Sequence, residues 1–272
     1  MKMRLALLIS ILVYTSYSCS RNPYQATNKV YKQQAKAFAK TLRKLPTTDS
    51  IDSIVQPPYF VGTTNFNLRK PNYVIIHHTA QDSTTQTLRT FTLPRTQVSA
   101  HYVIGKDGTV YHLLNDYMRA WHGGLAKWGS VTDINSASIG IELDNNGFEP
   151  FAEPQIQSLL HVLSSLKKQF NIPTANFIGH GDIAPTRKND PNPYFPWQQL
   201  AQKGFGYWYD DTTNISVPET FNNVQALRII GYDVKDSLAA IQAFHRHWEG
   251  DSLRTISDAD RKILYMIEKK YN

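Results

Sequence analysis

Four side chains in this sequence are of the types that bind metal ions and act on substrates. His180, Lys188 and Asp190 fall within one short segment, GHGDIAPTRKNDP, at residues 179–191. The two prolines of this segment disfavour a continuous helix or a central strand, so we predict an ordered loop. A further ligand must come from elsewhere, and the apolar run VIIHHT supplies His77.

The pair of imidazoles and the carboxylate form a candidate metal-ligand set. His77, His180 and Asp190 would leave one position free on a tetrahedral zinc ion, and an open position distinguishes catalytic from structural zinc. Water bound there has its pKa lowered to about 7. The wide separation of His77 and His180 in the sequence gives no local ligand motif. By residue type alone, a hydrogen-bonded core histidine at a strand end is the competing interpretation.

Two further charged residues are candidates for proton transfer and charge stabilisation. Glu142 lies in the apolar segment SIGIEL, where burial of a carboxylate without a partner is costly. It is either a general base held on a rigid strand or a strand-edge residue that faces water. Lys188 is either a stabiliser of a developing oxyanion or a solvated loop lysine.

The elements that must position these residues alternate between strand and helix patterns. We predict an α/β fold with a mixed central β-sheet flanked by helices, followed by a small three-helix module. Asp107-Gly108 is the expected hairpin turn, and Gly231 the expected end of a helix. The expected strands are 73–77, 100–104, 109–114, 138–143 and 176–178, and the expected helices are 84–93, 153–170, 219–230, 237–248 and 257–271.

The first residues predict export to the cell envelope. A short basic start and an apolar run at residues 5–14 are typical of a signal peptide and too short for comfortable membrane spanning. Cys19 is the only cysteine in the chain and resembles the lipidation cysteine of bacterial lipoproteins, with plain cleavage as the alternative. Ser20 and Arg21 after it point to the outer membrane, facing the periplasm. We therefore expect a membrane-anchored lipoprotein.

Composition divides the rest of the chain into segments. We predict a signal peptide at 1–18, a tether at 19–57 with one lysine-rich surface helix over 30–45, and an enzymatic domain at 58–208. A polar linker follows at 209–217, and the helical module occupies 218–272. The net charge of +7 falls to +5 when Lys2 and Arg4 are removed. The positive charges are scattered and no nucleic-acid-binding motif is present, so we expect no nucleic-acid partner.

Six ordered motifs together resemble one family. Read as IHxT, VSAHY, KDG, AWHG, IGIE and GHxDIAPxRKxDP, they extend from about Tyr73 to Trp197. This pattern resembles the type-2 zinc N-acetylmuramoyl-L-alanine amidases, relatives of the animal peptidoglycan recognition proteins. The resemblance implies cleavage of the amide bond between the lactyl group of N-acetylmuramic acid, or its anhydro form, and L-alanine of the peptidoglycan stem peptide.

The resemblance also implies a role for each candidate residue. His77, His180 and Asp190 would hold one Zn²⁺ per chain, Glu142 would be the base, and Lys188 would stabilise the oxyanion. Such an enzyme would serve cell-wall turnover and recycling, with peptidoglycan or muropeptides as partners. A non-catalytic muropeptide-binding protein is the alternative function, and loss of a ligand or of the base would be its expected sign.

Other residues near these motifs carry alternatives. His78 could line the cleft or lie at the surface, whereas Trp121 and His122 could contact sugar or peptide and Trp121 could equally fill the core. His101 is expected to pack or to support another residue. Members specialised for the anhydro sugar carry arginines in two regions where this chain has Gln97 and Asp133, so those sugar contacts are not carried over.

The C-terminal segment has a shorter likeness. The patterns LRxxGYD and AIxAFxxHW resemble the peptidoglycan-binding-type module of some lipoprotein amidases. A helical bundle that only supports the catalytic domain is the alternative. We expect the protein to be a monomer.

Overall fold

The computed structural model describes residues 22–44, 63–65 and 67–272. The predicted signal peptide and Cys19 lie outside these residues. The chain divides into two compact units, Met1–Thr64 and Asn65–Asn272. The first unit holds helix α1 (Gln25–Leu42), which has no buried residue. None of the helices in the described ranges is both long and apolar enough to cross a bilayer.

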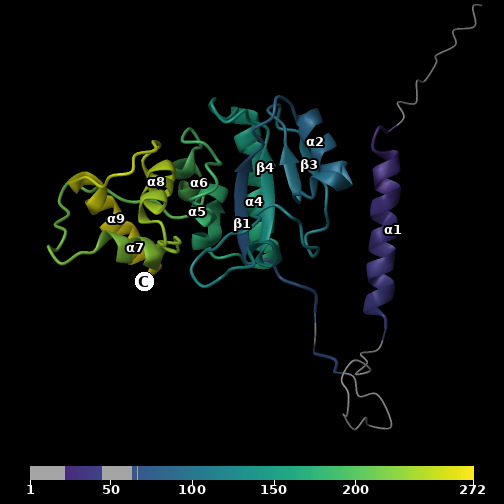
Figure 1. The fold of residues 1–272 in the computed structure, drawn as a ribbon, viewed down its shortest axis with the longest axis horizontal. Coiled ribbons are helices and arrows are strands. Elements are labelled where there is room, and N and C mark those ends of the chain that lie inside the picture. Colours follow the sequence, from purple (N-terminus) through teal and green to yellow (C-terminus); the bar gives the residue numbers. More distant parts are fainter. Residues whose placement is uncertain (1–21, 45–62, 66) are drawn as a thin grey trace, which may run out of the picture. The chain divides into compact units, whose positions relative to one another are not determined.

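The second unit is built on a five-stranded mixed sheet of order β3-β2-β4-β1-β5 (Figure 1). Strands β1, β4 and β5 run parallel to one another, β2 is parallel to β4, and β3 is antiparallel to β2. The strands are β1 (Tyr73–His78), β2 (Tyr102–Ile104), β3 (Val110–His112), β4 (Ser138–Leu143) and β5 (Phe177–Gly179). The predicted fold class is confirmed.

Helix α4 (Glu153–Phe170) covers one face of this sheet (Figure 1). Its apolar residues recur at helical spacing, so they form one stripe that the sheet can bury. That stripe packs against alternate residues of the central strands, among them Val74, Ile76 and Ile141. Helix α6 (Trp197–Gln202) contributes Trp197 and Leu200 to the same cluster.

The C-terminal helices belong to a second hydrophobic cluster, which includes residues from the sheet. They are α7 (Asn223–Ile230), α8 (Ser237–Trp248) and α9 (Asp258–Tyr271). The cluster joins Ile75 of β1 and Ile178 of β5 to Leu227, Phe244 and Leu264 of the three helices. Burial on both faces explains why the central strands are continuous apolar runs. The boundaries predicted for a separate helical module remain a prediction, but these helices share a core with the sheet.

Several element ends agree with prediction and others differ for local reasons. β4, α4 and α8 have the predicted bounds, and Ser257 with Asp260 forms the expected capping box of α9. Helix α7 begins later than predicted because the Asn222 side chain accepts the backbone N–H of Gln225 and caps it there. In the tether, α1 begins at Gln25, before the lysine-rich pattern that predicted it.

The segment 179–191 is not wholly a loop, which corrects our prediction. It opens with a one-turn helix, α5 (His180–Ile183), directly after β5. Pro185 lies beyond this turn, so it does not obstruct it. The remaining short elements are α2 (Thr84–Thr92), α3 (Ile134–Ala137) and the 3₁₀ turns Pro94–Thr96 and Thr174–Asn176.

Candidate metal centre

Three ligand atoms converge at the carboxyl ends of β1 and β5. The Nδ1 atoms of His77 and His180 are 2.9 Å apart, and Asp190 Oδ2 lies 3.1 Å and 3.0 Å from them. His77 belongs to β1, His180 follows β5 directly, and all three residues are buried. The structure thus brings together the three ligands that the sequence predicted, from positions far apart in the chain.

A chain of hydrogen bonds fixes which nitrogen of His77 faces the centre. The Ser138 hydroxyl donates to the Ile134 carbonyl at 2.6 Å, so its oxygen accepts from His122 Nε2 at 3.1 Å. His122 Nδ1 must then accept from His77 Nε2, 3.0 Å away. Burial lowers the pKa of His122 well below its usual value and, with the neighbouring His180, lowers that of His77 to about 4. Both rings are therefore neutral, and His77 Nδ1 presents a lone pair.

His180 is oriented by a different partner. Its Nε2 lies 3.1 Å from the Gly123 carbonyl oxygen, which can only accept, so Nε2 carries the proton. Arg187 donates to the same carbonyl at 2.8 Å and to the Leu125 carbonyl, which fixes the loop around Gly123. His180 Nδ1 consequently faces His77 and Asp190.

Asp190 completes the set of three candidate ligand atoms. Burial opposes ionisation, but the adjacent His180 and His77 hold the pKa of Asp190 well below its usual value. The Gly181 N–H donates to the Asp190 carbonyl at 2.7 Å, and the Asp190–Pro191 peptide is cis. Two imidazole nitrogens and one carboxylate oxygen about 3 Å apart form a donor set that fits a divalent metal ion.

Glu142 lies beside this centre on the neighbouring strand. It is paired in register with His77, and its Oε1 is 4.0 Å from His77 Nδ1. Its Oε2 is buried and has no hydrogen-bond partner within the described part of the chain. Burial and the nearby Asp190 raise the pKa of Glu142 well above its usual value. The strand-edge interpretation is wrong, because this carboxyl group faces a buried polar centre.

Lys188 is half-buried on the loop between α5 and Asp190. Its charge acts on the centre, since it partly opposes the rise in the pKa of Glu142 that burial and Asp190 cause. Its backbone N–H donates to the Ala184 carbonyl at 2.9 Å, and its carbonyl accepts from Arg246 of α8 at 3.3 Å. The loop that carries Lys188 is therefore held both by α5 and by a C-terminal helix.

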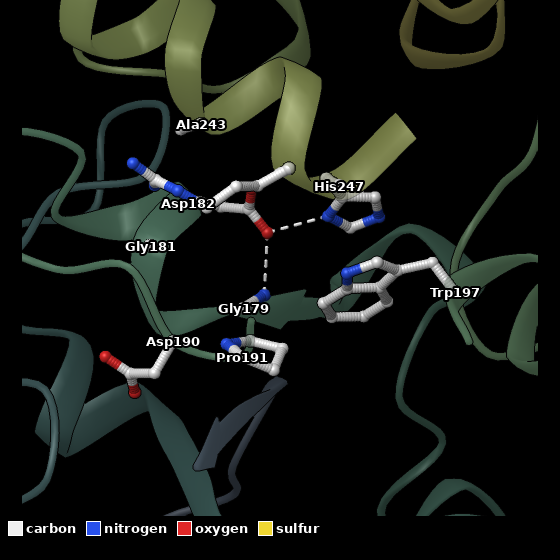
Figure 2. Close-up of a pocket in the computed structure, with 9 residues that line it drawn as sticks. Gly179, Gly181, Asp182, Asp190, Pro191, Trp197, Ala243 and His247 are labelled. Atoms are coloured by element: carbon white, nitrogen blue, oxygen red, sulfur yellow. Dashed lines mark hydrogen bonds and ion pairs between the residues drawn. The ribbon is translucent and has the colours of Figure 1, made fainter. Parts of the chain in front are cut away.

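Figure 2 shows the small cavity between this loop and α8, with Asp182 at its centre. Asp182 Oδ2 accepts from the Gly179 N–H at 2.7 Å and from His247 Nδ1 at 2.8 Å. Its Oδ1 accepts from the Tyr232 hydroxyl at 3.0 Å. The His247 ring stacks on Trp197 at 3.9 Å between centroids. A buried carboxylate with three donors thus ties α5, which begins with His180, to α8.

The three proposed substrate contacts occupy different environments. Trp121 is 54% exposed, so it does not fill the core and stays available for a substrate. His122 is buried and uses both ring nitrogens, which corrects the expectation that it contacts sugar or peptide. His78 is buried rather than at the surface, and its Nδ1 accepts the backbone N–H of Asn192 at 3.0 Å. It holds the chain just after Asp190.

Sequence reasoning missed residues that orient the ligands. Ser138 orients His122, and the Asn135 side chain accepts the N–H groups of His122 and Gly123 at 3.1 Å and 2.8 Å. Gly140 is required because a Cβ there would collide with the His122 ring. A polar serine and a glycine in the apolar strand SIGIEL were the only signals, and neither specifies a partner. His101, as expected, is a buried packing residue whose Nδ1 accepts the Gly140 N–H.

The fold and the site together define a class of protein. In open α/β sheets, ligands bind at the carboxyl ends of parallel strands. Here that edge carries a His-His-Asp set, a buried carboxylate and a lysine. This combination is suited to metal-assisted hydrolysis.

Comparison with known proteins identifies the family. Residues 67–193 match the N-acetylmuramoyl-L-alanine amidase family. The chain is 34% identical over 223 residues to N-acetylmuramoyl-L-alanine amidase AmiD of Escherichia coli, covering 70% of this chain and 79% of AmiD. It is 36% identical over 104 residues to 1,6-anhydro-N-acetylmuramyl-L-alanine amidase AmpD of Haemophilus influenzae, covering 38% of this chain and 56% of AmpD.

Solved structures agree with this assignment. The complex of E. coli AmiD with anhydro-N-acetylmuramic acid-L-Ala-D-γ-Glu-L-Lys has a TM-score of 0.67 at 30% identity, covering 78% of this chain and 93% of that one. AmpDh3 of Pseudomonas aeruginosa has a TM-score of 0.68 at 26% identity, covering 80% and 98%. The chain belongs to the N-acetylmuramoyl-L-alanine amidase family.

Proposed function

We propose that this protein is a zinc-dependent enzyme that hydrolyses the amide bond between N-acetylmuramic acid, or its anhydro form, and L-alanine of the stem peptide. The observation that carries the proposal is the convergence of three candidate ligand atoms beside Glu142. Two imidazoles and one carboxylate are a typical donor set for catalytic zinc. Relatives named as amidases of this bond support the choice of substrate.

His77, His180 and Asp190 would hold the ion. Bound there, zinc would polarise the scissile carbonyl and lower the pKa of a coordinated water molecule. The orientation of the two histidines is set in advance by His122 and by the Gly123 carbonyl. Such outer partners fix the tautomer and raise the basicity of ligand rings.

Glu142 would move the proton. Its carboxylate on β4 would take a proton from the attacking water and deliver it to the amine of the departing L-alanine. Its raised pKa suits both roles, because a stronger base accepts the first proton more readily and the resulting acid still releases it to an amine. Lys188 would place positive charge near the oxyanion, where preorganised charge lowers the barrier.

Muropeptides are the substrates that we propose, for turnover and recycling of the cell wall. AmiD was solved with an anhydromuramyl peptide that ends in L-Lys, and AmpDh3 with an anhydromuramic pentapeptide. In this chain Asp133 forms an ion pair with Arg119 at 3.0 Å. Members of the family specialised for the anhydro sugar are expected to carry an arginine in the region of Asp133, so this region differs in charge from theirs. Trp121 is exposed and available to stack on sugar or peptide.

The decisive experiment compares the wild type with Glu142→Gln on intact sacculi and on purified anhydromuropeptides, with products identified by mass. We expect release of L-alanine-terminated peptides by the wild type, complete loss with a chelator, and recovery with Zn²⁺. Glu142→Gln should retain zinc and lose about 10²–10⁴-fold in rate. A wild type that binds muropeptide but releases no peptide would support the non-catalytic alternative instead.

We also propose that the protein is a lipoprotein anchored at Cys19, on the strength of the sequence of residues 1–21. The anchor would place the enzyme in the cell envelope, at the outer membrane. Cys19→Ala should release the protein from membranes in cell fractionation. Unchanged membrane association of this variant would contradict lipidation.

A further inference from the structure

Helix α1 presents two opposed surfaces and buries neither of them within its unit. Phe38 is 58% exposed and Leu42 is 74% exposed, and Tyr31 and Val30 are exposed as well. The stability of helices in proteins comes mostly from packing of an amphipathic face rather than from helix propensity. Tyr24, the residue before α1, makes no side-chain capping hydrogen bond. The helix therefore lacks the buried face from which helices in proteins gain most of their stability.

The apolar residues of α1 form one stripe. Tyr31, Ala35, Phe38 and Leu42 follow one another at spacings of four, three and four residues. These spacings bring side chains to the same side of a helix. The stripe ends in the two most exposed side chains of the set, Phe38 and Leu42.

The opposite side of α1 is basic. Lys29, Lys32, Lys36 and Lys40 also recur at spacings of three and four, and all are exposed. Lys36 and Phe38 are two residues apart, which places them about 200° apart around the helix axis. Residues 22–44 contain six lysines and arginines and no aspartate or glutamate. The positive charge is thus not neutralised within this segment.

We propose that α1 lies on a membrane surface that contains anionic phospholipid. Tyr31, Phe38 and Leu42 enter the interface, and the lysines contact the phosphate groups. Amphipathic helices with a basic face and an aromatic and aliphatic face bind in the plane of such an interface. The wall polymer offers negative charge as well, but it is hydrated throughout and offers no apolar layer for Phe38 and Leu42. This surface is independent of the amidase site, so the proposal goes beyond the proposed function.

The test uses the chain from Ser20 onward, which keeps every described element and lacks both the apolar start and Cys19. Binding is measured by sedimentation with vesicles of phosphatidylcholine containing one third phosphatidylglycerol, with pure phosphatidylcholine vesicles, and with isolated sacculi. We expect binding to the anionic vesicles that weakens as salt is raised, because surface attraction is screened. Pure phosphatidylcholine and sacculi should retain much less protein.

Variants separate the two surfaces of α1. Replacing Lys32, Lys36 and Lys40 by Gln keeps helix propensity and should weaken binding to anionic vesicles by about tenfold or more. Phe38→Ala with Leu42→Ala should abolish the part of the binding that resists high salt. The matched control replaces three exposed lysines of the second unit by Gln, which gives the same change in net charge: Lys168, Lys203 and Lys235. We expect this control to bind anionic vesicles as well as the wild type does.

Three results would overturn the proposal. They are equal binding to neutral and anionic vesicles, an equal loss in the control variant, and retention by sacculi that depends on the same α1 residues. Cleavage of a soluble muropeptide should be unchanged in the α1 variants. Loss of cleavage in the wild type would instead contradict the amidase function, so the two proposals fail separately.

Discussion

At the scale of single residues, the centre depends on which ring nitrogen each histidine leaves unprotonated. His77 presents Nδ1 because Nε2 donates to His122, whose own proton goes to Ser138. His180 presents Nδ1 because Nε2 donates to the Gly123 carbonyl. The candidate metal ligands are therefore oriented by groups that are not themselves candidate ligands.

This arrangement predicts that His122 controls metal affinity. His122→Ala removes the acceptor for His77 Nε2, so the proton can move to Nδ1 and compete with the ion. We expect zinc affinity to fall by about 10–100-fold. Competition with a chromophoric chelator measures it, and His161→Ala, at an exposed position of α4, is the control. Equal zinc affinity in wild type and His122→Ala would refute the role.

At the scale of elements, helix α8 is joined to the site through buried polar groups. His247 and Tyr232 donate to the two oxygens of Asp182, which also caps the turn that begins with His180. Arg246 reaches the carbonyl of Lys188. The position of the loop that carries Lys188 therefore depends on a helix more than fifty residues away in the sequence.

The Asp182 contacts should contribute measurably to stability. His247→Phe preserves an aromatic ring against Trp197 but removes a donor, and Tyr232→Phe removes the other side-chain donor. Each should lower the free energy of unfolding by about 1–3 kcal/mol, because a buried carboxylate loses a partner. Urea denaturation measures the change, with His161→Phe as the surface control. The double variant should not be additive, since both donors share one acceptor.

The free energy of unfolding should also depend on pH through Glu249, the residue that follows α8. Burial and the nearby Asp260 raise the pKa of Glu249 to about 7. The folded chain therefore keeps this proton to higher pH than the unfolded chain does. The associated stability is fully present below about pH 4.5 and is lost as the pH rises through about 7.

Glu249→Gln is the test of this pH dependence. Because Glu249 is half-exposed, we expect solvent to reduce the effect to about 1 kcal/mol. Denaturation at pH 5 and at pH 8 should show a smaller loss of stability in the variant than in the wild type. Equal losses in the two proteins would place the pH dependence at other groups.

At the scale of the whole molecule, the sheet is buried on both faces. α4 covers one face, and α7, α8 and α9 belong to the cluster that includes Ile75 and Ile178. The C-terminal helices therefore form part of the same core as the sheet. They exclude water from β1, which carries His77, and from β5, which His180 directly follows.

Truncation tests this architecture. A chain that ends at residue 216 loses α7, α8 and α9 and exposes the apolar side chains of the second cluster, so we expect it to aggregate or to lose cooperative unfolding. A chain that begins at Asn65 keeps the whole second unit and should unfold cooperatively. Solubility and thermal denaturation compare the two. A soluble, fully active protein ending at residue 216 would contradict the shared core.

The order of the strands and of the longer helices could be predicted from the sequence alone, because periodicity and turn residues are local properties. The bounds of β4, α4 and α8 follow from such patterns. The candidate ligands His77, His180 and Asp190 were recognisable by type and motif. Element ends that depend on a cap, such as Asn222 before α7, were less well predicted because capping competes with propensity over a few residues.

Which partners these residues have depends on how the elements pack against one another. His122 accepts a hydrogen bond from His77 because its ring occupies the space beside Gly140, where a side chain would collide with it. The stripe on α8 predicted that the helix buries one face, but not that this face covers the sheet. Periodicity specifies that a side chain is buried, whereas the identity of its neighbours depends on contacts between segments that are distant in sequence.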